Sequence, residues 1–107
     1  MITYADNICL TKKTEARLDK IKECIRVRKG MVGTVIIALS NNGSDVFEVI
    51  PCYMFKTDLY SKIDLFVCGI AENSGAAQEM IENLISEYID SGLDITMREY
   101  FIRRFKM

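Results

Sequence analysis

The feature that most constrains the fold is the stretch 63–92, which combines an apolar segment, a polar turn and an amphipathic segment. Residues 63–71 are apolar at nearly every position, which is typical of a central strand that is covered on both faces. The turn after this strand offers Asn73 or Ser74 as a helix N-cap, and Gly92 is suited to end the helix in a left-handed conformation. The apolar stripe by which this helix is expected to pack on the sheet consists of Ala77, Met80, Ile81, Leu84, Ile85, Tyr88 and Ile89.

A second amphipathic segment, residues 11–29, predicts a helix that begins after Thr11 and stops at Gly30. Its apolar stripe is narrow, which leaves a wide solvent-exposed face. Eight of the fourteen Lys and Arg residues of the chain lie in this segment, so the solvent-exposed face is basic. The stripe consists of Leu18, Ile21, Cys24 and Ile25.

Two further apolar segments predict a hairpin. Residues 32–39 are β-branched and apolar on both faces, which favours a second central strand. Asn42-Gly43 is a strong signal for a tight turn, so residues 46–55 are expected to return as the antiparallel partner. Pro51 lies inside this return segment and favours an edge position or a bulge, because proline cannot donate to a sheet ladder.

The two ends of the chain carry weaker patterns. In the first ten residues, alternating apolar side chains favour a strand, while a helix that begins at Asp6 is the rival interpretation. Near the C-terminus, Ile95, Met97 and Phe101 suggest a last strand. This strand would complete a βαβ unit with a right-handed crossover and parallel strands.

These elements predict one domain, residues 1–107, of the α+β class. The economical arrangement is a two-layer sandwich, in which four or five strands adopt a ferredoxin-like arrangement with two helices on one face. The pattern leaves the strand order open. An outline of this kind is shared by too many unrelated functions to indicate a family.

Composition excludes several classes of protein. Half of the 107 residues are hydrophobic, which is too many for a disordered chain. No run approaches the roughly 20 apolar residues that span a bilayer. The first residues also lack the basic and apolar regions of a signal peptide. We therefore expect a cytoplasmic protein without a membrane partner.

The four cysteines, Cys9, Cys24, Cys52 and Cys68, have no paired spacing typical of a zinc site. Three of them lie in apolar periodic segments, where a reduced cysteine acts as a small hydrophobic residue. The chain has no histidine, which is the commonest general base and transition-metal ligand. These observations predict free thiols, no metal and no cofactor, and they favour a protein that is not an enzyme.

The turn 69–75 precedes a helix N-terminus, a place that can bind phosphate through its backbone amides. It lacks the glycine and lysine pattern of phosphate-binding loops, and Glu72 puts a carboxylate where the anion would lie. An ordinary N-cap turn is therefore the favoured interpretation.

The basic face of the segment 11–29 is a second candidate site, because nucleic acid or an acidic partner would be attracted to it. The net charge of the whole chain is nevertheless −1, so a solvated helix face is the favoured interpretation. The residues concerned are Lys12, Lys13, Arg17, Lys20, Arg26 and Arg28, joined in the nucleic-acid interpretation by Arg103 and Arg104.

A small enzyme is the other alternative. Glu48 and Asp64 are acids on otherwise apolar strands, and two carboxylates brought together could serve in general acid–base catalysis. Cys68 offers a thiol on the same strand segment as Asp64. A deep pocket that contains these side chains would favour this interpretation.

A partner surface follows from the alternation of side chains along the strand 63–71. Phe66, Cys68 and Ile70 are expected on one face of the sheet. If both helices cover the other face, this apolar face is exposed to solvent, which is rare in a soluble monomer. Burial against a second copy of the chain is the simplest way to remove it from solvent. We therefore expect a small binding module that acts as a homo-oligomer, with a further protein or small-molecule partner left open.

Overall fold

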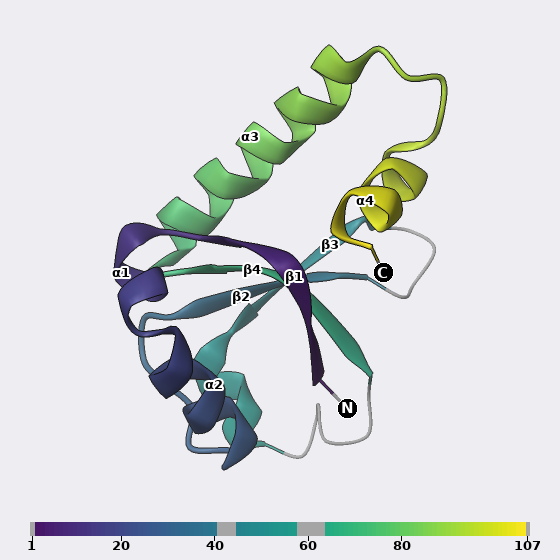
Figure 1. Cartoon of the computed structure of the whole chain (residues 1–107). Coiled ribbons are helices and arrows are strands. Elements are labelled where there is room, and N and C mark those ends of the chain that lie inside the picture. Colours follow the sequence, from purple (N-terminus) through teal and green to yellow (C-terminus); the bar gives the residue numbers. More distant parts are fainter. Residues whose placement is uncertain (1, 41–44, 58–63, 107) are drawn as a thin grey trace.

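The computed structural model describes residues 2–40, 45–57 and 64–106 (Figure 1). Within these residues, four strands form one mixed sheet, accompanied by four α-helices and one 3₁₀ helix, η1. In chain order the elements are β1 (Ile2–Leu10), α1 (Lys12–Ala16), α2 (Leu18–Arg26), β2 (Val35–Leu39), β3 (Phe47–Pro51), η1 (Cys52–Lys56), β4 (Leu65–Ala71), α3 (Ser74–Ser91) and α4 (Met97–Phe105).

The sheet has the strand order β1-β4-β2-β3. β1 runs parallel to β4, whereas β2 pairs antiparallel with both β4 and β3. β4 and β2 are therefore the central strands, as the sequence predicted. All five residues of β2 are buried, which agrees with a continuous run of apolar and mostly β-branched side chains.

The antiparallel hairpin of β2 and β3 is confirmed, with Leu39 paired to Phe47 close to the connection. The expected tight turn, Asn42-Gly43, lies outside the described residues. β3 is an edge strand, as its proline predicted. It ends at Pro51, earlier than expected, because η1 follows directly.

β1 is a strand, which was the favoured interpretation of the first ten residues. It occupies the other edge of the sheet, and its pairing with β4 is irregular between Tyr4 and Cys9. Within this irregular stretch Ala5 is buried, whereas Asp6 and Asn7 are exposed. An irregular and charged stretch on an edge strand discourages pairing with another chain.

The predicted helix after Thr11 is present as two short helices. Thr11 is the N-cap of α1 and forms a capping box with Thr14. The helix is interrupted at Arg17, whose backbone angles of φ −118° and ψ 15° are not helical. Thr14 is buried, and its hydroxyl donates a hydrogen bond to the carbonyl of Ile70 at 3.0 Å. This hydrogen bond attaches the start of α1 to β4.

α3 has both caps that the sequence predicted. The Asn73 side chain accepts a hydrogen bond from the amide of Ala76 at 2.7 Å, and Gly92 adopts the left-handed conformation with φ 65°. The apolar stripe reaches the core only in part, because Leu84 is buried whereas Ile89 is 67% exposed. Figure 1 shows the reason, since the C-terminal part of α3 runs beyond the strands.

The last strand expected around Ile95, Met97 and Phe101 is wrong, because this segment contains helix α4. Thr96 caps the helix through its side chain. Phe101 and Phe105 lie four residues apart, so they share one helix face, and both are buried. The described residues therefore contain no C-terminal βαβ unit, and the parallel pair is β1 with β4.

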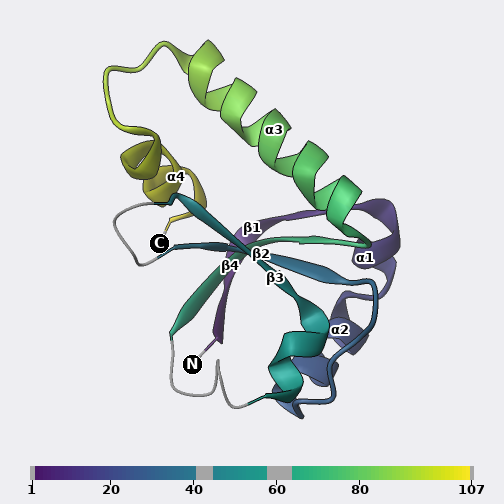
Figure 2. The same cartoon turned by 180° about the vertical axis from the view of Figure 1, so that it is seen from behind.

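Helices cover both faces of the sheet, as Figures 1 and 2 show. α2 and η1 pack on the face that carries Ile36 and Val67. α3 and α4 pack on the opposite face, which carries Ile37 and Cys68. The α+β class is confirmed, but the expected two-layer sandwich with two helices on one face is not confirmed, because α2 and η1 cover the second face. The observed strand order does not confirm the ferredoxin-like arrangement.

The expected partner surface of Phe66, Cys68 and Ile70 does not lie on one face of the sheet. The pairing of β2 with β4 shifts register between Ile37 and Ala38, and an extra residue on β4 reverses the alternation of side chains. Ile70 therefore packs in the core under α2, whereas Cys68 packs in the core under α3. Both side chains are fully buried by this chain's own helices. The bare-face argument for a homo-oligomer no longer applies.

Candidate functional site

The predicted basic surface lies on α1 and α2. Its proposed partner-binding members are all exposed: Lys12, Lys13, Arg17 and Lys20. Acidic side chains alternate with them, and Arg26 donates a hydrogen bond to the carboxylate of Glu23 at 2.9 Å. Arg103 and Arg104 lie on α4, which packs on the opposite face of the sheet from α2. The structure therefore places a surface of mixed charge on α1 and α2 and does not join it to the basic tail.

The two candidate carboxylates of an enzyme are not brought together. Glu48 lies on β3 and Asp64 lies immediately before β4, with β2 between these strands. Neighbouring strands lie about 4.8 Å apart, so the two positions are separated by about 10 Å or more across the sheet. Cys68 is fully buried, and burial raises the pKa of its thiol to about 12. The structure therefore does not bring the two carboxylates together, and it buries the thiol of Cys68.

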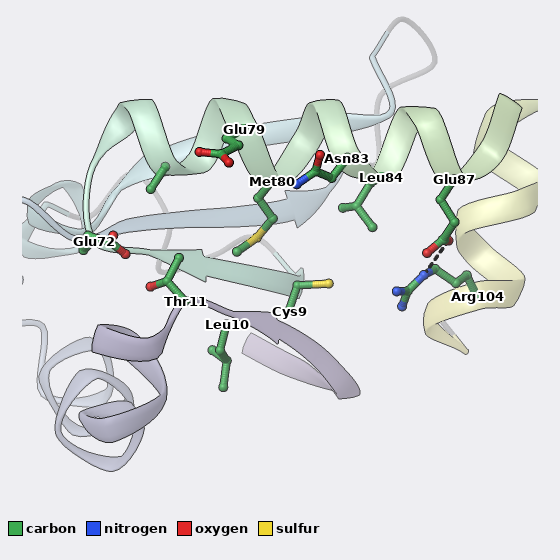
Figure 3. A pocket seen from close by; sticks show the side chains of 11 residues that line it. Cys9, Leu10, Thr11, Glu72, Glu79, Met80, Asn83, Leu84, Glu87 and Arg104 are labelled. Atoms are coloured by element: carbon green, nitrogen blue, oxygen red, sulfur yellow. Dashed lines mark hydrogen bonds and ion pairs between the residues drawn. The ribbon is translucent and has the colours of Figure 1, made fainter. Parts of the chain in front are cut away.

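A cleft lies between β1, α3 and α4, on the face of the sheet opposite α2 (Figure 3). It exists because α3 packs over the central strands β4 and β2 and leaves room above the C-terminal end of β1. Its volume of about 520 Å³ lies within the usual range for small-molecule sites. The residues that α3 contributes recur along one side of the helix: Ala76, Glu79, Met80, Asn83, Leu84 and Glu87.

Glu72 and Glu79 make one end of the cleft acidic. The nearby Thr11 hydroxyl, a hydrogen bond from the backbone amide of Glu72 itself and the charge of Lys13 hold the pKa of the Glu72 carboxyl below its usual value. The carboxylate is therefore charged at neutral pH. Its Oε2 atom is enclosed and has no hydrogen-bond partner within the described part of the chain. Such an acceptor is costly to leave unpaired, so this end suits a donor group of a ligand.

Arg104 is held in a fixed position at the other end of the cleft. Its Nε donates a hydrogen bond to the carboxylate of Glu87 at 2.7 Å, and its guanidinium lies 4.6 Å from the ring centroid of Phe105. The hydroxyl of Tyr100 donates to the same carboxylate at 2.8 Å. Figure 3 shows the terminal nitrogens of Arg104 turned toward Cys9 and the cleft. The guanidinium is thus oriented in advance as a donor.

The ion pair of Glu87 with Arg104 predicts a dependence of stability on pH. The hydrogen bonds from Arg104 and Tyr100 lower the pKa of Glu87, although burial opposes them. A lowered pKa contributes stability above the unfolded value of about 4.3, and this contribution is lost as the pH falls through the folded value. Because the pair is partly exposed, we expect Glu87→Gln to reduce the free energy of unfolding by about 1 kcal/mol or less at pH 7.

Urea unfolding of both proteins between pH 2 and pH 8 measures this effect, and the difference between them should shrink below about pH 4. Glu82→Gln is the matched control, because Glu82 is exposed on α3 and its side chain accepts a hydrogen bond from Gln78 at 3.2 Å. A difference between wild type and Glu87→Gln that stays constant across this range would contradict the prediction.

All four cysteines are free thiols, as the sequence predicted, and they differ in accessibility. Cys9 and Cys24 are partly exposed, whereas Cys52 and Cys68 are fully buried. Burial raises the pKa of Cys52 to about 11 and that of Cys68 to about 12. Because a thiolate is the reactive form, we expect maleimide to label Cys9 and Cys24 first in the native protein at pH 7. Mass spectrometry of the peptides checks this order, and early labelling of Cys68 would contradict it.

This cleft was not anticipated from the sequence. The sequence indicates Glu72 only as an obstacle to phosphate binding, and Arg104 only as part of the basic tail. Glu79, Asn83 and Glu87 recur every four residues beside the apolar stripe, which is a signal for a polar line along the edge of a packed helix face. This spacing does not indicate what lies opposite, because β1 and α4 reach the cleft only through the tertiary fold.

No protein-family model, curated protein or solved structure matches this chain. Within the residues described by the structure, no group of three or more acidic or cysteine side chains is placed to hold a metal ion. None of the helices in that part of the chain has both the length and the apolar character needed to cross a membrane.

Proposed function

We propose that this protein is a small binding module whose ligand is a small molecule held in the cleft between β1, α3 and α4. The observation that carries this proposal is the chemical contrast along the cleft. Charged carboxylates lie at one end, the fixed guanidinium of Arg104 lies at the other, and the apolar Met80 and Leu84 lie between them. Small-molecule sites combine apolar walls with a few well-placed polar groups in this way.

The available side chains favour reversible binding over catalysis. The chain has no histidine that could act as a general base. Cys9 contributes a thiol to the cleft, but burial raises its pKa, against the opposing effect of Arg104. The thiol is therefore protonated at neutral pH and is a weak nucleophile. The carboxylate of Glu87 already accepts hydrogen bonds from Arg104 and Tyr100.

Amide chemical shifts measured by NMR with a diverse set of small polar molecules test this proposal. We expect the shifts to move at cleft residues such as Cys9, Met80 and Asn83. Addition of a short oligonucleotide is the rival arm of the experiment, because nucleic acid would instead move the amides of α1 and α2 in a salt-dependent way. Shifts confined to α1 and α2, with none at the cleft for any molecule, would refute the proposal.

A pair of substitutions on α3 supplies the control. Asn83 lines the cleft, whereas Glu82 does not, and both side chains are exposed. We expect Asn83→Trp to obstruct the cleft and to remove binding without loss of the fold. Glu82→Trp places the same side chain on the next residue and is expected to leave binding unchanged. Equal binding by both variants would show that the ligand lies elsewhere.

A further inference from the structure

We propose that the ligand is a linear zwitterion, with a primary ammonium group at the Glu72 and Glu79 end of the cleft and a carboxylate at the Arg104 end. This inference rests on the proposed function and names its ligand class. It follows from three features of the cleft: the charges at each end, the apolar wall between them and the distance along α3.

The ammonium end is defined by two carboxylates. Glu72 and Glu79 both line the cleft, and neither forms a salt bridge within the described residues. Lys13 lies close enough to Glu72 to act on its carboxylate, but it does not line the cleft. The enclosed Oε2 of Glu72 also lacks a donor within the same part of the chain. A primary ammonium group brings three hydrogen-bond donors and a positive charge. It would therefore supply both a counter-charge for the two carboxylates and a donor for Oε2 of Glu72.

The carboxylate end is defined by Arg104. The guanidinium uses Nε to donate to Glu87 and lies 4.6 Å from the ring centroid of Phe105, so two contacts hold it in place. Its terminal nitrogens face the cleft, where they can donate to a carboxylate (Figure 3). The negative charge of Glu87 partly offsets that of Arg104. We therefore expect this end to contribute less to affinity than the ammonium end.

The length of the ligand follows from the helix. Glu79 and Glu87 are eight residues apart on α3, which places them about 12 Å apart along the helix axis. A charge-assisted hydrogen bond of about 2.8 Å at each end leaves about 6 Å for the body of the ligand. Measured from the ammonium nitrogen to the carboxylate oxygen, this is close to the span of about two extended residues, or of a chain with about three methylene groups between the two charged groups. A free α-amino acid is too short to reach both ends.

The wall between the two ends selects for an apolar body. Met80 and Leu84 face this part of the cleft from α3, with Cys9 opposite them on β1 (Figure 3). These side chains offer few hydrogen bonds to a polar ligand body. Burial of a methylene chain against them is favourable, because it removes apolar surface from water. The probe that fits these features is 4-aminobutanoate, which carries an ammonium and a carboxylate on three methylene groups.

Calorimetric titration of the full chain with 4-aminobutanoate, butylamine, butanoate and alanine tests the inference. Loss of one charge-assisted hydrogen bond corresponds to about tenfold or more in affinity. We therefore expect 4-aminobutanoate to bind most tightly, butylamine about tenfold more weakly, and butanoate and alanine more weakly still. Equal affinity for butanoate and 4-aminobutanoate would overturn the assignment of the ammonium end.

Two substitutions assign the ends of the ligand. Glu79→Gln is expected to weaken the binding of both 4-aminobutanoate and butylamine, whereas Arg104→Gln is expected to weaken the binding of 4-aminobutanoate and to leave that of butylamine unchanged. Glu82→Gln and Arg103→Gln are the matched controls, since neither residue lines the cleft. If Glu79→Gln and Arg104→Gln leave both affinities unchanged, the inference is wrong.

The failure of this inference can be told apart from that of the proposed function. If the four probes do not bind but other small molecules move the cleft amides in a way that Asn83→Trp removes, the ligand class is wrong and the binding site stands. If nothing moves these amides, both proposals fail.

Discussion

Replacement of Phe101 by alanine is expected to lower the free energy of unfolding by about 3–5 kcal/mol. Phe101 lies on α4, is fully buried and is surrounded by aromatic rings. The ring centroids of Phe47 and Tyr100 lie 4.9 Å and 5.0 Å from its own, and that of Phe105 lies 6.2 Å away. The substitution removes these contacts and leaves a cavity between α4 and the sheet. Urea unfolding followed by circular dichroism measures the loss.

The control for Phe101→Ala lies two residues further along α4. Arg103 is exposed and forms a 3.0 Å ion pair with Glu99 within the same helix. Exposed pairs of this kind contribute little, so Arg103→Ala should cost about 0.5 kcal/mol or less. If Phe101→Ala costs no more than Arg103→Ala, α4 does not pack as described and this segment is better explained by the strand that its sequence suggested.

Replacement of Ile21 by alanine is expected to cost about 2–5 kcal/mol, for a different structural reason. Ile21 lies on α2, is only 1% exposed and belongs to the core on the sheet face opposite α3. This substitution tests whether α2 covers that face. The side chain of the preceding residue, Lys20, is exposed, so Lys20→Ala should change stability by about 0.5 kcal/mol or less.

A small effect of Ile21→Ala would mean that α2 does not cover its sheet face. The apolar face would then be exposed to solvent, and this exposed face would again support the expectation of a homo-oligomer. Sedimentation of the wild-type protein is the companion measurement, because a dimer formed through a sheet face cannot coexist with the α2 packing described here.

The two substitutions should also differ in their effect on the cleft. Phe101 and Arg104 share α4, so loosening this helix displaces the guanidinium from the end of the cleft. Ile21 lies on the opposite side of the sheet. We therefore expect Phe101→Ala to weaken ligand binding at a urea concentration where the protein is still folded, and Ile21→Ala to leave binding unchanged under matched conditions.

Part of the candidate site could be predicted from local sequence. Glu79, Asn83 and Glu87 lie on one side of a helix that ends at Gly92, as predicted, and begins after Asn73, one of the two predicted N-caps. Helical spacing places these three side chains in a line without any knowledge of the rest of the fold. The partners across the cleft belong to β1, which lies far from α3 in the sequence, and to α4, in a segment for which the sequence predicts a strand. No local sequence pattern relates these partners to the line of side chains on α3.

The sequence by itself determined the features that depend on the local composition of the chain. The buried runs that became β2 and β4, the cap at Asn73 and the edge position of β3 next to Pro51 all follow from local stereochemistry. Each of these features is set by a few adjacent residues, so the local sequence is enough to predict it.

Only the tertiary structure decided which face each element covers. The extra residue at Cys68 reverses the alternation on β4 and sends Ile70 to the face under α2. Phe101 and Phe105 are compatible with more than one local structure, and burial against the sheet decides for a helix. The cleft exists because α3 covers β4 and β2 but leaves the end of β1 open. Contacts between distant segments set all three outcomes, and the local period of a sequence does not contain that information.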